Sequence, residues 1–362
     1  MQRELVPHLD KWEAQGVIDR EAWLKAGEAG LLCASIPVEY GGGGGTEAHD
    51  LTIYQEIVRA GLGGGFGAGY TVSYCIVAHY ILAYGTEAQK REWLPRMARG
   101  EIIGAIAMTE PGAGSDLQAV RTTALKVDGG YAISGSKTYI SNGQCADLVL
   151  VVAKTDPTLG AKGMSLIAVE PAKVEGFRRG RNLDKMGMHA QDTSELFFDN
   201  CIVPEENILG GTPGMGFVQL MQQLVFERML IVLGSIVAME QAVDMTTAFV
   251  RERPMFGQRL WDFQNTQFKL AEAKTIAIVA RTFADALITR MLADDLDPAT
   301  AAAAKLWATE NQGKVVDECL QLFGGAGYMN EYPISRLYTE ARVARIFGGS
   351  SEVMKLIVSR TL

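Results

Sequence analysis

Cysteine and histidine are scarce in this chain. The 362 residues include five cysteines and four histidines, all far apart. No CxxC or HExxH motif brings them together, so we expect neither a metal site nor a disulfide framework. The odd cysteine count is typical of a reduced protein, and we expect a cytoplasmic location.

Basic charge is also in short supply. The chain has 34 Lys and Arg against 42 Asp and Glu, a formal net charge of −8. Nucleic-acid binding rests on Lys and Arg that neutralise phosphates, so no nucleic-acid partner is expected. The longest apolar run near the middle, residues 229–239, is shorter than the ~20 residues that cross a bilayer, and no membrane span is expected.

Three common motifs are missing. The stretch 130–138 nearly spells a P-loop, but it has one residue too many before Lys137 and lies between predicted strands. The glycines of 61–69 form no strict GxGxxG after a strand, which disfavours a Rossmann domain. A GxSxG elbow is absent, which disfavours an α/β-hydrolase.

The composition is that of a globular protein with a large core. Hydrophobic residues make up 48% of the chain and charged residues 21%. The length suggests roughly two or three domains. The pattern predicts a helical domain over 1–100, a β-domain over 101–210 and a helical bundle over 211–362. The expected fold is therefore mainly α with an inserted β-domain.

Periodicity places the elements within these domains. Helices are predicted over 50–60, 71–84 and 87–99, the last with Thr86 as its N-cap, and a loop over the five glycines 41–45. Short β-branched and apolar runs predict the strands 101–109, 131–135, 148–154, 164–170 and 194–203. Further helices are predicted over 217–250, 263–293, 298–322, 334–345 and 351–361.

One glycine-rich turn carries a candidate binding site. The segment 107–116, AMTEPGAGSD, ends a predicted strand and could present backbone N–H groups and the Ser115 hydroxyl to an anion. On this segment alone, a tight β-turn without a ligand is an equal interpretation. A second glycine-rich segment, QLFGGAGYMNEYP, occupies 321–333, and KTYISN (137–142) and ERPMFG (252–257) stand between the two.

Together these segments resemble the two signatures of the acyl-CoA dehydrogenase family, in the family's order and over nearly the whole chain. The resemblance implies an N-terminal helical domain, a central β-barrel or sandwich and a C-terminal helical bundle. It also implies FAD as the cofactor. The chain departs from the family at its start, where members usually carry a longer first helix.

The resemblance implies a set of FAD contacts. In the β-domain, Met108 and Thr109 match the strand end that bonds the isoalloxazine ring, and Tyr139 matches the aromatic side chain lying against it. Ser141 matches a hydroxyl near flavin N5, and Ser115 matches one at the pyrophosphate. In the C-terminal domain, the implied contacts to FAD, several of them to FAD of a neighbouring subunit, are Arg253, Phe256, Gln321, Gly325, Ser350 and Glu352.

The resemblance also implies a catalytic base. One family position for this carboxylate lies in the last loop, where this chain has Gly348. The other position is Glu227, as in the isovaleryl-CoA and long-chain members. Without that context, Glu227 beside Arg228 would be read as a surface pair. The backbone N–H of Gly348 matches one donor to the thioester carbonyl, and the residues expected to contact the acyl-CoA are Ser115, Arg228 and Phe347.

The implied reaction is the α,β-dehydrogenation of an acyl-CoA thioester to the trans-2-enoyl-CoA. The implied partners are an electron-transfer flavoprotein and further copies of the chain, with a tetramer expected. Two alternatives stay open. One is a specialised relative on the same scaffold, such as a branched, terpenoid or carrier-bound acyl dehydrogenase or a flavin oxidase; the other is a non-catalytic binding subunit.

Overall fold

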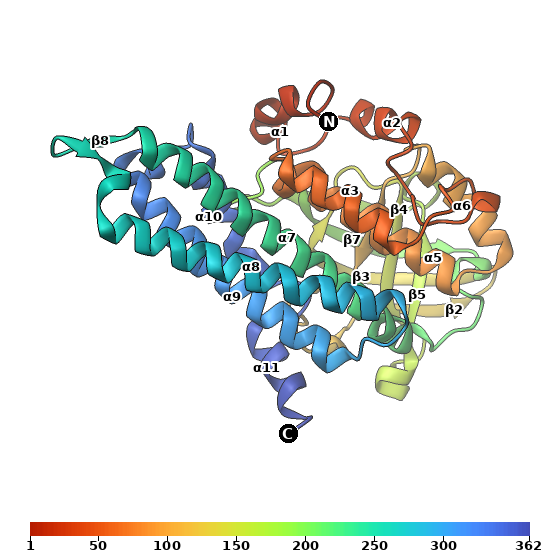
Figure 1. The fold of residues 1–362 in the computed structure, drawn as a ribbon. Helices are drawn as coiled ribbons and strands as arrows, with labels where there is room; N and C mark the ends of the chain where they lie inside the picture. Colours follow the sequence, from red (N-terminus) through yellow and green to blue (C-terminus); the bar gives the residue numbers. More distant parts are fainter. The chain divides into compact units, whose positions relative to one another are not determined.

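The computed structural model describes all 362 residues, and the chain divides into two compact units (Figure 1). Unit 1 contains residues 1–54, 62–185 and 189–223. Unit 2 contains residues 55–61, 186–188 and 224–362. The N-terminal helices and the strands therefore share one unit, and the long C-terminal helices form the core of the other.

The N-terminal part is helical, as predicted. Its α-helices are α1 (Leu9–Gln15), α2 (Arg20–Glu28), α3 (Glu47–Arg59), α4 (Ala68–Tyr70), α5 (Ala78–Tyr84) and α6 (Glu87–Ala98). The glycines 41–45 lie in a loop, and Thr86 caps α6. The Thr86 hydroxyl accepts from the Gln89 N–H at 3.3 Å while the Gln89 side chain accepts from the Thr86 N–H at 2.9 Å, which forms a capping box.

The segment from Gly63 to Tyr84 differs from expectation. Its first glycines are helical, and two stretches, Gly63–Gly67 and Thr71–Val77, have π-helical turns. Close packing explains the glycines. A Cβ on Gly65 would lie 2.7 Å from the Ala190 Cβ, and one on Gly69 would lie 2.9 Å from the Trp23 ring. The sequence pattern predicts a helix only from residue 71, whereas glycine lets the preceding buried segment approach its neighbours closely.

A seven-stranded sheet forms the rest of unit 1, in the order β1-β4-β2-β3-β7-β6 with β5 paired to β4. The strands are β1 (Gly104–Ala107), β2 (Thr123–Val127), β3 (Gly130–Ser141), β4 (Leu148–Lys154), β5 (Met164–Val169), β6 (Phe177–Asn182) and β7 (Thr193–Val203). Each of the five predicted strands has a counterpart, but β1 is shorter than the predicted 101–109, and β3 continues to Ser141, beyond the predicted end at residue 135. The strands β2 and β6 were not predicted. β6 reads FRRGRN and is largely exposed at the edge of the sheet, so no apolar run marks it.

The helices of unit 2 follow the prediction to within a few residues. They are α7 (Gly216–Glu252, in unit 2 from residue 224), α8 (Gln264–Leu292), α9 (Pro298–Phe323), α10 (Pro333–Ala344) and α11 (Ser351–Ser359). Buried side chains from α7, α8 and α9 form a shared core that includes Met229, Ile236, Ala277, Ala308 and Val316. A small hairpin of β8 (Pro254–Met255) and β9 (Gln258–Arg259), which was not predicted, lies between α7 and α8 in the chain.

Two helical segments are long and apolar enough to cross a membrane by length and composition alone. They are Gly63–Tyr84 and Gly216–Glu252, and the second contains the run 229–239 that was judged too short. Within their most apolar windows, 67% and 61% of the residues are buried inside the protein. Both therefore have the burial of core helices.

Short 3₁₀ turns complete the secondary structure: Val6–His8, Val38–Tyr40, Leu117–Ala119, Pro157–Gly163, Pro171–Lys173, Glu205–Asn207, Leu260–Asp262 and Gly324–Tyr328.

Candidate active site

The predicted base, Glu227, lies on a buried stretch of α7. Its exposed fraction is 7%, and that of Arg228 is 5%. The Arg228 guanidinium is expensive to bury, and burial lowers its pKa while the Glu227 carboxylate opposes that shift. The Arg228 Nε has no hydrogen-bond partner in the protein. The Glu227 and Arg228 side chains are thus both shielded from bulk water.

The last loop of the chain lies against the same helix. Gly348 and Gly349 follow α10 with φ angles of +64° and +97°, a region that glycine adopts without strain. A Cβ on Gly348 would lie 2.4 Å from the Ile231 Cδ1. Ile231 is one helical turn beyond Glu227, so the two share a face of α7. The structure therefore brings both candidate positions of the base to one region of unit 2.

The Gly348 N–H is available to a ligand. Neighbouring loop N–H groups are used, since Phe347 donates to the Val343 carbonyl at 3.1 Å and Ser351 donates to the Arg345 carbonyl at 3.0 Å. The Gly348 N–H makes no hydrogen bond within the chain. Because backbone donors are normally paired, an open one on a half-buried glycine beside Glu227's helix face can serve a substrate carbonyl.

A lysine that sequence reasoning missed completes this cluster. Lys305 on α9 has no exposed surface, and its ammonium donates to the Gly349 carbonyl at 2.5 Å. Burial lowers its pKa to about 8, and the nearby Arg228 charge contributes to that shift. In the sequence, Lys305 follows four alanines in a helical run and looks like an ordinary surface lysine.

In unit 1, a buried ion pair fixes the strand end at Met108 and Thr109. Lys137 has a fully buried side chain, and its ammonium bonds Glu110 at 2.8 Å and the Met108 carbonyl at 3.1 Å. The Thr138 N–H also donates to the Thr109 carbonyl at 2.9 Å. Burial lowers the pKa of Lys137 to about 8 against the pull of Glu110. These contacts tie the end of β1 to β3.

Tyr139 is held in a strained and exposed position on β3. The pairing of β3 with β7 shifts between Lys137 and Ile140, which marks a bulge. Tyr139 has φ of +59° and its side chain is 68% exposed. A positive φ on a bulky residue costs on the order of 1–3 kcal/mol and is found mostly at functional sites. The bulge turns an aromatic face outward, which is what a flat ring ligand requires. Ser141, at the end of β3, is half-buried.

Ser115 lies in an exposed turn that the backbone closes tightly. Glu110 and Ala113 exchange backbone hydrogen bonds of 2.9 and 3.1 Å. Beyond them, Ser115 is exposed, and a Cβ on Gly112 or Gly114 would meet no atom within 4 Å. The turn thus leaves open space for an anionic group beside the serine hydroxyl.

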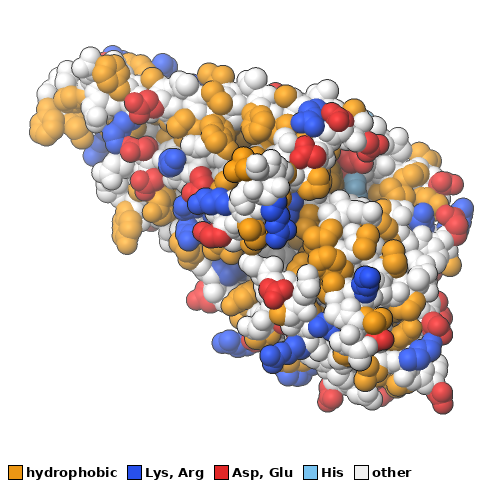
Figure 2. Space-filling model, turned by 90° about the horizontal axis from the view of Figure 1, so that it is seen from below, with side chains coloured by type: hydrophobic (Ala, Val, Ile, Leu, Met, Phe, Trp, Pro, Cys, Tyr) orange, Lys and Arg blue, Asp and Glu red, His pale blue; other side chains and the backbone are white.

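The structure does not bring Arg253 and Phe256 to the Glu227 cluster. Both are exposed, Phe256 by 90%, on the hairpin at the tip of unit 2 (Figure 1). At about 1.5 Å per residue, the end of α7 lies roughly 38 Å from Glu227. Hydrophobic side chains gather at this end of the molecule (Figure 2), and Met255 and Phe268 are among the exposed ones there.

The remaining predicted residues of unit 2 are exposed or half-buried. Gln321, near the end of α9, and Gly325, in the following turn, are exposed. Ser350 caps α11 through the Val353 N–H at 3.4 Å, and Glu352 is exposed in the first turn of that helix. Phe347 is 41% exposed beside Gly348.

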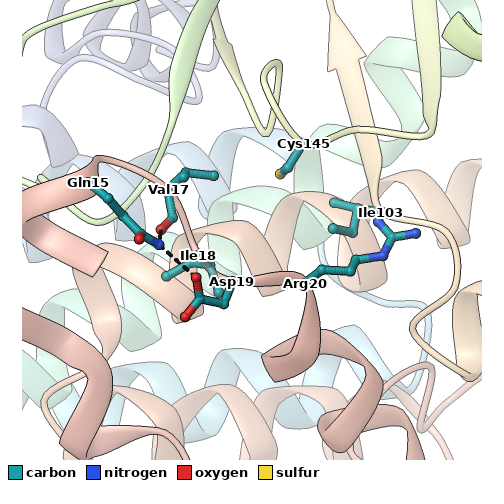
Figure 3. A pocket seen from close by; sticks show the side chains of 7 residues that line it. All are labelled: Gln15, Val17, Ile18, Asp19, Arg20, Ile103 and Cys145. Carbon is teal, nitrogen blue, oxygen red and sulfur yellow. Dashed lines mark hydrogen bonds between the residues drawn. The ribbon is translucent and has the colours of Figure 1, made fainter. Parts of the chain in front are cut away.

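A pocket of about 430 Å³ in unit 1 contains none of the predicted residues (Figure 3). Its wall includes Gln15, whose amide bonds Asp19 at 2.9 Å, and Cys145. Burial raises the pKa of the Cys145 thiol well above its usual range, so this thiol is a poor nucleophile. No group of His, Cys, Asp and Glu side chains could hold a metal ion.

Three family models match the chain in order. They are the N-terminal domain of acyl-CoA dehydrogenase over residues 1–101, the middle domain over 105–201 and the C-terminal domain over 214–362. The chain belongs to the acyl-CoA dehydrogenase family. It is an oxidoreductase with the family's fold, and acyl-CoA dehydrogenases are FAD flavoproteins.

Individual relatives agree with this assignment. The chain is 44% identical to the mitochondrial long-chain specific acyl-CoA dehydrogenase of Mus musculus over 100% of this chain and 83% of the relative. It is 34% identical to the mitochondrial isovaleryl-CoA dehydrogenase of Solanum tuberosum over 100% and 87%. The crystal structure of acyl-CoA dehydrogenase from Geobacillus kaustophilus superposes with a TM-score of 0.95 at 42% identity, covering 99% of this chain and 94% of that one.

The residues present fit the isoalloxazine ring and phosphates of FAD. The exposed Tyr139 face and the strand end at Met108 and Thr109 suit a flat ring with hydrogen-bonding edges. The open glycine turn at Ser115 suits a phosphate. These residues of unit 1 would hold the group that, when bound, accepts a hydride from the substrate.

Proposed function

We propose that this chain oxidises an acyl-CoA thioester to the trans-2-enoyl-CoA with Glu227 as the base. One observation carries the proposal. The loop position that could hold an acid is Gly348, and it packs on Ile231, one turn from the buried Glu227. The carboxylate would remove the α-proton of the thioester while the β-hydride leaves for FAD.

The α-proton of a thioester is only weakly acidic, so its removal requires a group that stabilises the negative charge developing on the carbonyl oxygen. The open N–H of Gly348 would donate to the thioester carbonyl as negative charge develops on its oxygen. A preorganised donor of this kind is worth about 3–4 kcal/mol of barrier. Arg228 is buried next to Glu227, and the Glu227 charge opposes the lowering of the Arg228 pKa by burial. The low exposure of both side chains excludes water from the proton transfer.

Each unit contains proposed FAD contacts. In unit 1 they are Met108, Thr109, Tyr139 and Ser141 at the ring and Ser115 at the pyrophosphate. In unit 2, Ser350 and Glu352 would serve the same chain, while Arg253, Phe256, Gln321 and Gly325 would serve FAD of a neighbouring copy. Arg253 suits a diphosphate, because a guanidinium can bond two oxygens at once.

For the substrate we propose the CoA thioester of a long acyl chain, with Arg228, Phe347 and Ser115 contacting the acyl-CoA. The long-chain relative from Mus musculus is more similar to this chain than the isovaleryl relative from Solanum tuberosum. We propose an electron-transfer flavoprotein as acceptor, a homotetramer as the assembly, and the cytoplasm as the location, in keeping with five unpaired cysteines.

Anaerobic mixing of the yellow holoenzyme with a panel of straight and branched acyl-CoAs tests the proposal. Long straight chains should bleach the flavin absorbance fastest, and electron-transfer flavoprotein should restore it. Rapid reoxidation by oxygen with peroxide release would instead indicate a flavin oxidase. No bleaching with any acyl-CoA would overturn the proposed reaction.

A further inference from the structure

Lys305 is a buried charged group that the proposed reaction does not use. Its side chain has no exposed surface, and its ammonium has one hydrogen-bond acceptor, the Gly349 carbonyl at 2.5 Å. Burying an ammonium is costly, and burial with the nearby Arg228 charge lowers its pKa to about 8. An apolar side chain at this position of α9 would be buried at a lower free-energy cost. The presence of a lysine therefore points to a role for its hydrogen bond to Gly349.

The loop that Lys305 contacts is intrinsically soft. Gly348 and Gly349 are adjacent glycines with positive φ, and glycine has more backbone freedom than any other residue. The N–H of Gly348 makes no hydrogen bond that would fix its direction. Without an external anchor, this peptide would sample several orientations.

α9 supplies that anchor at three points. Lys305 holds the middle of the loop through the Gly349 carbonyl. One turn and a half further along, the Glu310 carboxylate accepts from the Ser351 hydroxyl at 2.6 Å and from the Arg345 guanidinium at 3.4 Å. Arg345 and Ser351 flank the loop, and a backbone bond of 3.0 Å joins them. Both ends and the centre of the loop are therefore fixed to one helix.

We propose that Lys305 and Glu310 are positioning residues that hold the 345–351 loop, so that the Gly348 N–H keeps one direction beside the Glu227 face of α7. The inference rests on the proposed function, in which that N–H donates to the thioester carbonyl. A donor stabilises developing charge only when it is already aimed at the oxygen. Displacement of such a group by about 1 Å can cost ~10²-fold in rate.

Ionisation of a bound ligand tests the donor without any redox step. Acetoacetyl-CoA has acidic protons between two carbonyls, and its enolate absorbs light in the ultraviolet. On the holoenzyme, the apparent pKa of this ligand reports how well the carbonyl oxygen is stabilised. Lys305→Met keeps the length and packing of the side chain but removes the donor. It should raise the ligand pKa by about one to two units, which corresponds to a 10–100-fold loss of enolate stabilisation.

The matched control is Lys314→Met, the same change at an exposed lysine of α9. It should leave ligand ionisation and flavin reduction unchanged. With an acyl-CoA substrate, Lys305→Met should lower the rate of flavin reduction about 10–100-fold while substrate affinity changes little. Lys305→Arg keeps a donor and should recover part of the rate. A purely structural lysine would change FAD content and thermal stability without moving the ligand pKa.

Glu310→Gln covers the case in which Lys305→Met fails to fold or to hold FAD. It weakens the anchors at the ends of the loop and should raise the ligand pKa in the same direction, by a smaller amount. A ligand pKa equal to that of the wild type in every folded Lys305 and Glu310 variant would overturn the inference. That result leaves the proposed function standing, because wild-type flavin reduction by acyl-CoA tests the function separately.

Discussion

At the scale of single residues, the space around position 348 decides whether a catalytic carboxylate fits there. Gly348 has a φ of +64°, and the space where its side chain would begin is filled by the Ile231 Cδ1 at 2.4 Å. An acid at 348 and an isoleucine at 231 therefore compete for the same volume. Glu227, one turn away, needs no such space.

This competition predicts the outcome of moving the base. Glu227→Ala with Gly348→Glu should recover little flavin reduction, because the new side chain meets Ile231 and an L residue at this φ costs roughly 1–2 kcal/mol. Adding Ile231→Val removes the Cδ1 atom and should raise the rate above that of the double variant. Glu227→Ala with Ile231→Val alone is the control and should stay inactive. Equal recovery with and without the Ile231 change would show that Ile231 is not the obstacle.

Lys305 also predicts a pH dependence of stability. Its folded-state pKa of about 8 lies below the usual 10.5, so between these values the unfolded chain binds a proton that the folded chain does not. The buried charge is then a cost below pH 8 that disappears as the pH rises toward 10.5. Two to three pKa units correspond to on the order of 3 kcal/mol.

The Lys305→Met variant lacks the ammonium group that titrates at position 305. The stability of the wild type relative to Lys305→Met should therefore rise between pH 7.5 and pH 10, as measured by the difference in their thermal midpoints at each pH. A difference that is constant or falls across this range would contradict the assignment of Lys305 as the titrating group.

The sequence identifies some of these residues and not others, for physical reasons. Glu227 stands in an apolar run and matches a family position, so it could be predicted before its burial was known. Lys305 and Lys137 could not, because an isolated lysine in a helix or hairpin normally faces solvent. Lys305 is an interior residue because α8, α10 and α11 all pack on α9, which is a tertiary feature.

At the scale of elements, the bulge in β3 has the clearest consequence. It holds Tyr139 in a left-handed conformation with an exposed ring, where the ring contributes little to the core. The strained backbone at Tyr139 lowers the stability of the fold, and it presents an aromatic face to solvent.

Tyr139→Gly should separate these two roles. Glycine adopts the observed φ freely, so the apoprotein should gain about 1 kcal/mol of stability and show a higher thermal midpoint. The same variant should bind FAD more weakly, because the ring face is lost. Tyr139→Phe keeps the ring and should retain FAD affinity. A Tyr139→Gly protein with unchanged FAD affinity would remove Tyr139 from the proposed site.

Element prediction succeeded where periodicity was long. α7, α8 and α9 were placed to within a few residues, because their apolar positions repeat over many turns. β6 was missed because its residues are polar, and the β8–β9 hairpin because each strand has only two residues. The π-helical turns at 63–67 and 71–77 were not predicted, because the apolar periodicity does not distinguish them from α-helix.

At the scale of the whole molecule, the chain carries a formal net charge of −8, and basic and acidic side chains are interspersed on the face shown in Figure 2. The exposed apolar side chains at the hairpin end are the exception. Phe256 at 90% exposure is what an assembly interface or a ligand from another subunit would cover.

The proposed contact of Arg253 with FAD of a neighbouring copy can be tested by complementation. Arg253→Ala alone should weaken FAD binding in a homo-oligomer, and Glu227→Gln alone should slow flavin reduction by at least ~10²-fold. Coexpression of the two should restore activity, because a subunit with an intact Glu227 then receives Arg253 from its neighbour. Hybrids no more active than Arg253→Ala alone would place Arg253 on the FAD of its own chain, and a stable, active monomer would contradict the shared site.

The proposed reaction depends most on Glu227, and one measurement tests that role directly. The rate of anaerobic flavin reduction by saturating acyl-CoA is compared in the wild type, Glu227→Gln and the control Asp244→Asn, an exposed acid on the same helix. Glu227→Gln should bind FAD and acyl-CoA normally yet reduce its flavin at least ~10²–10⁴-fold more slowly, as expected for a lost general base. Asp244→Asn should match the wild type. Flavin reduction by Glu227→Gln at the wild-type rate would contradict the account and place the base elsewhere.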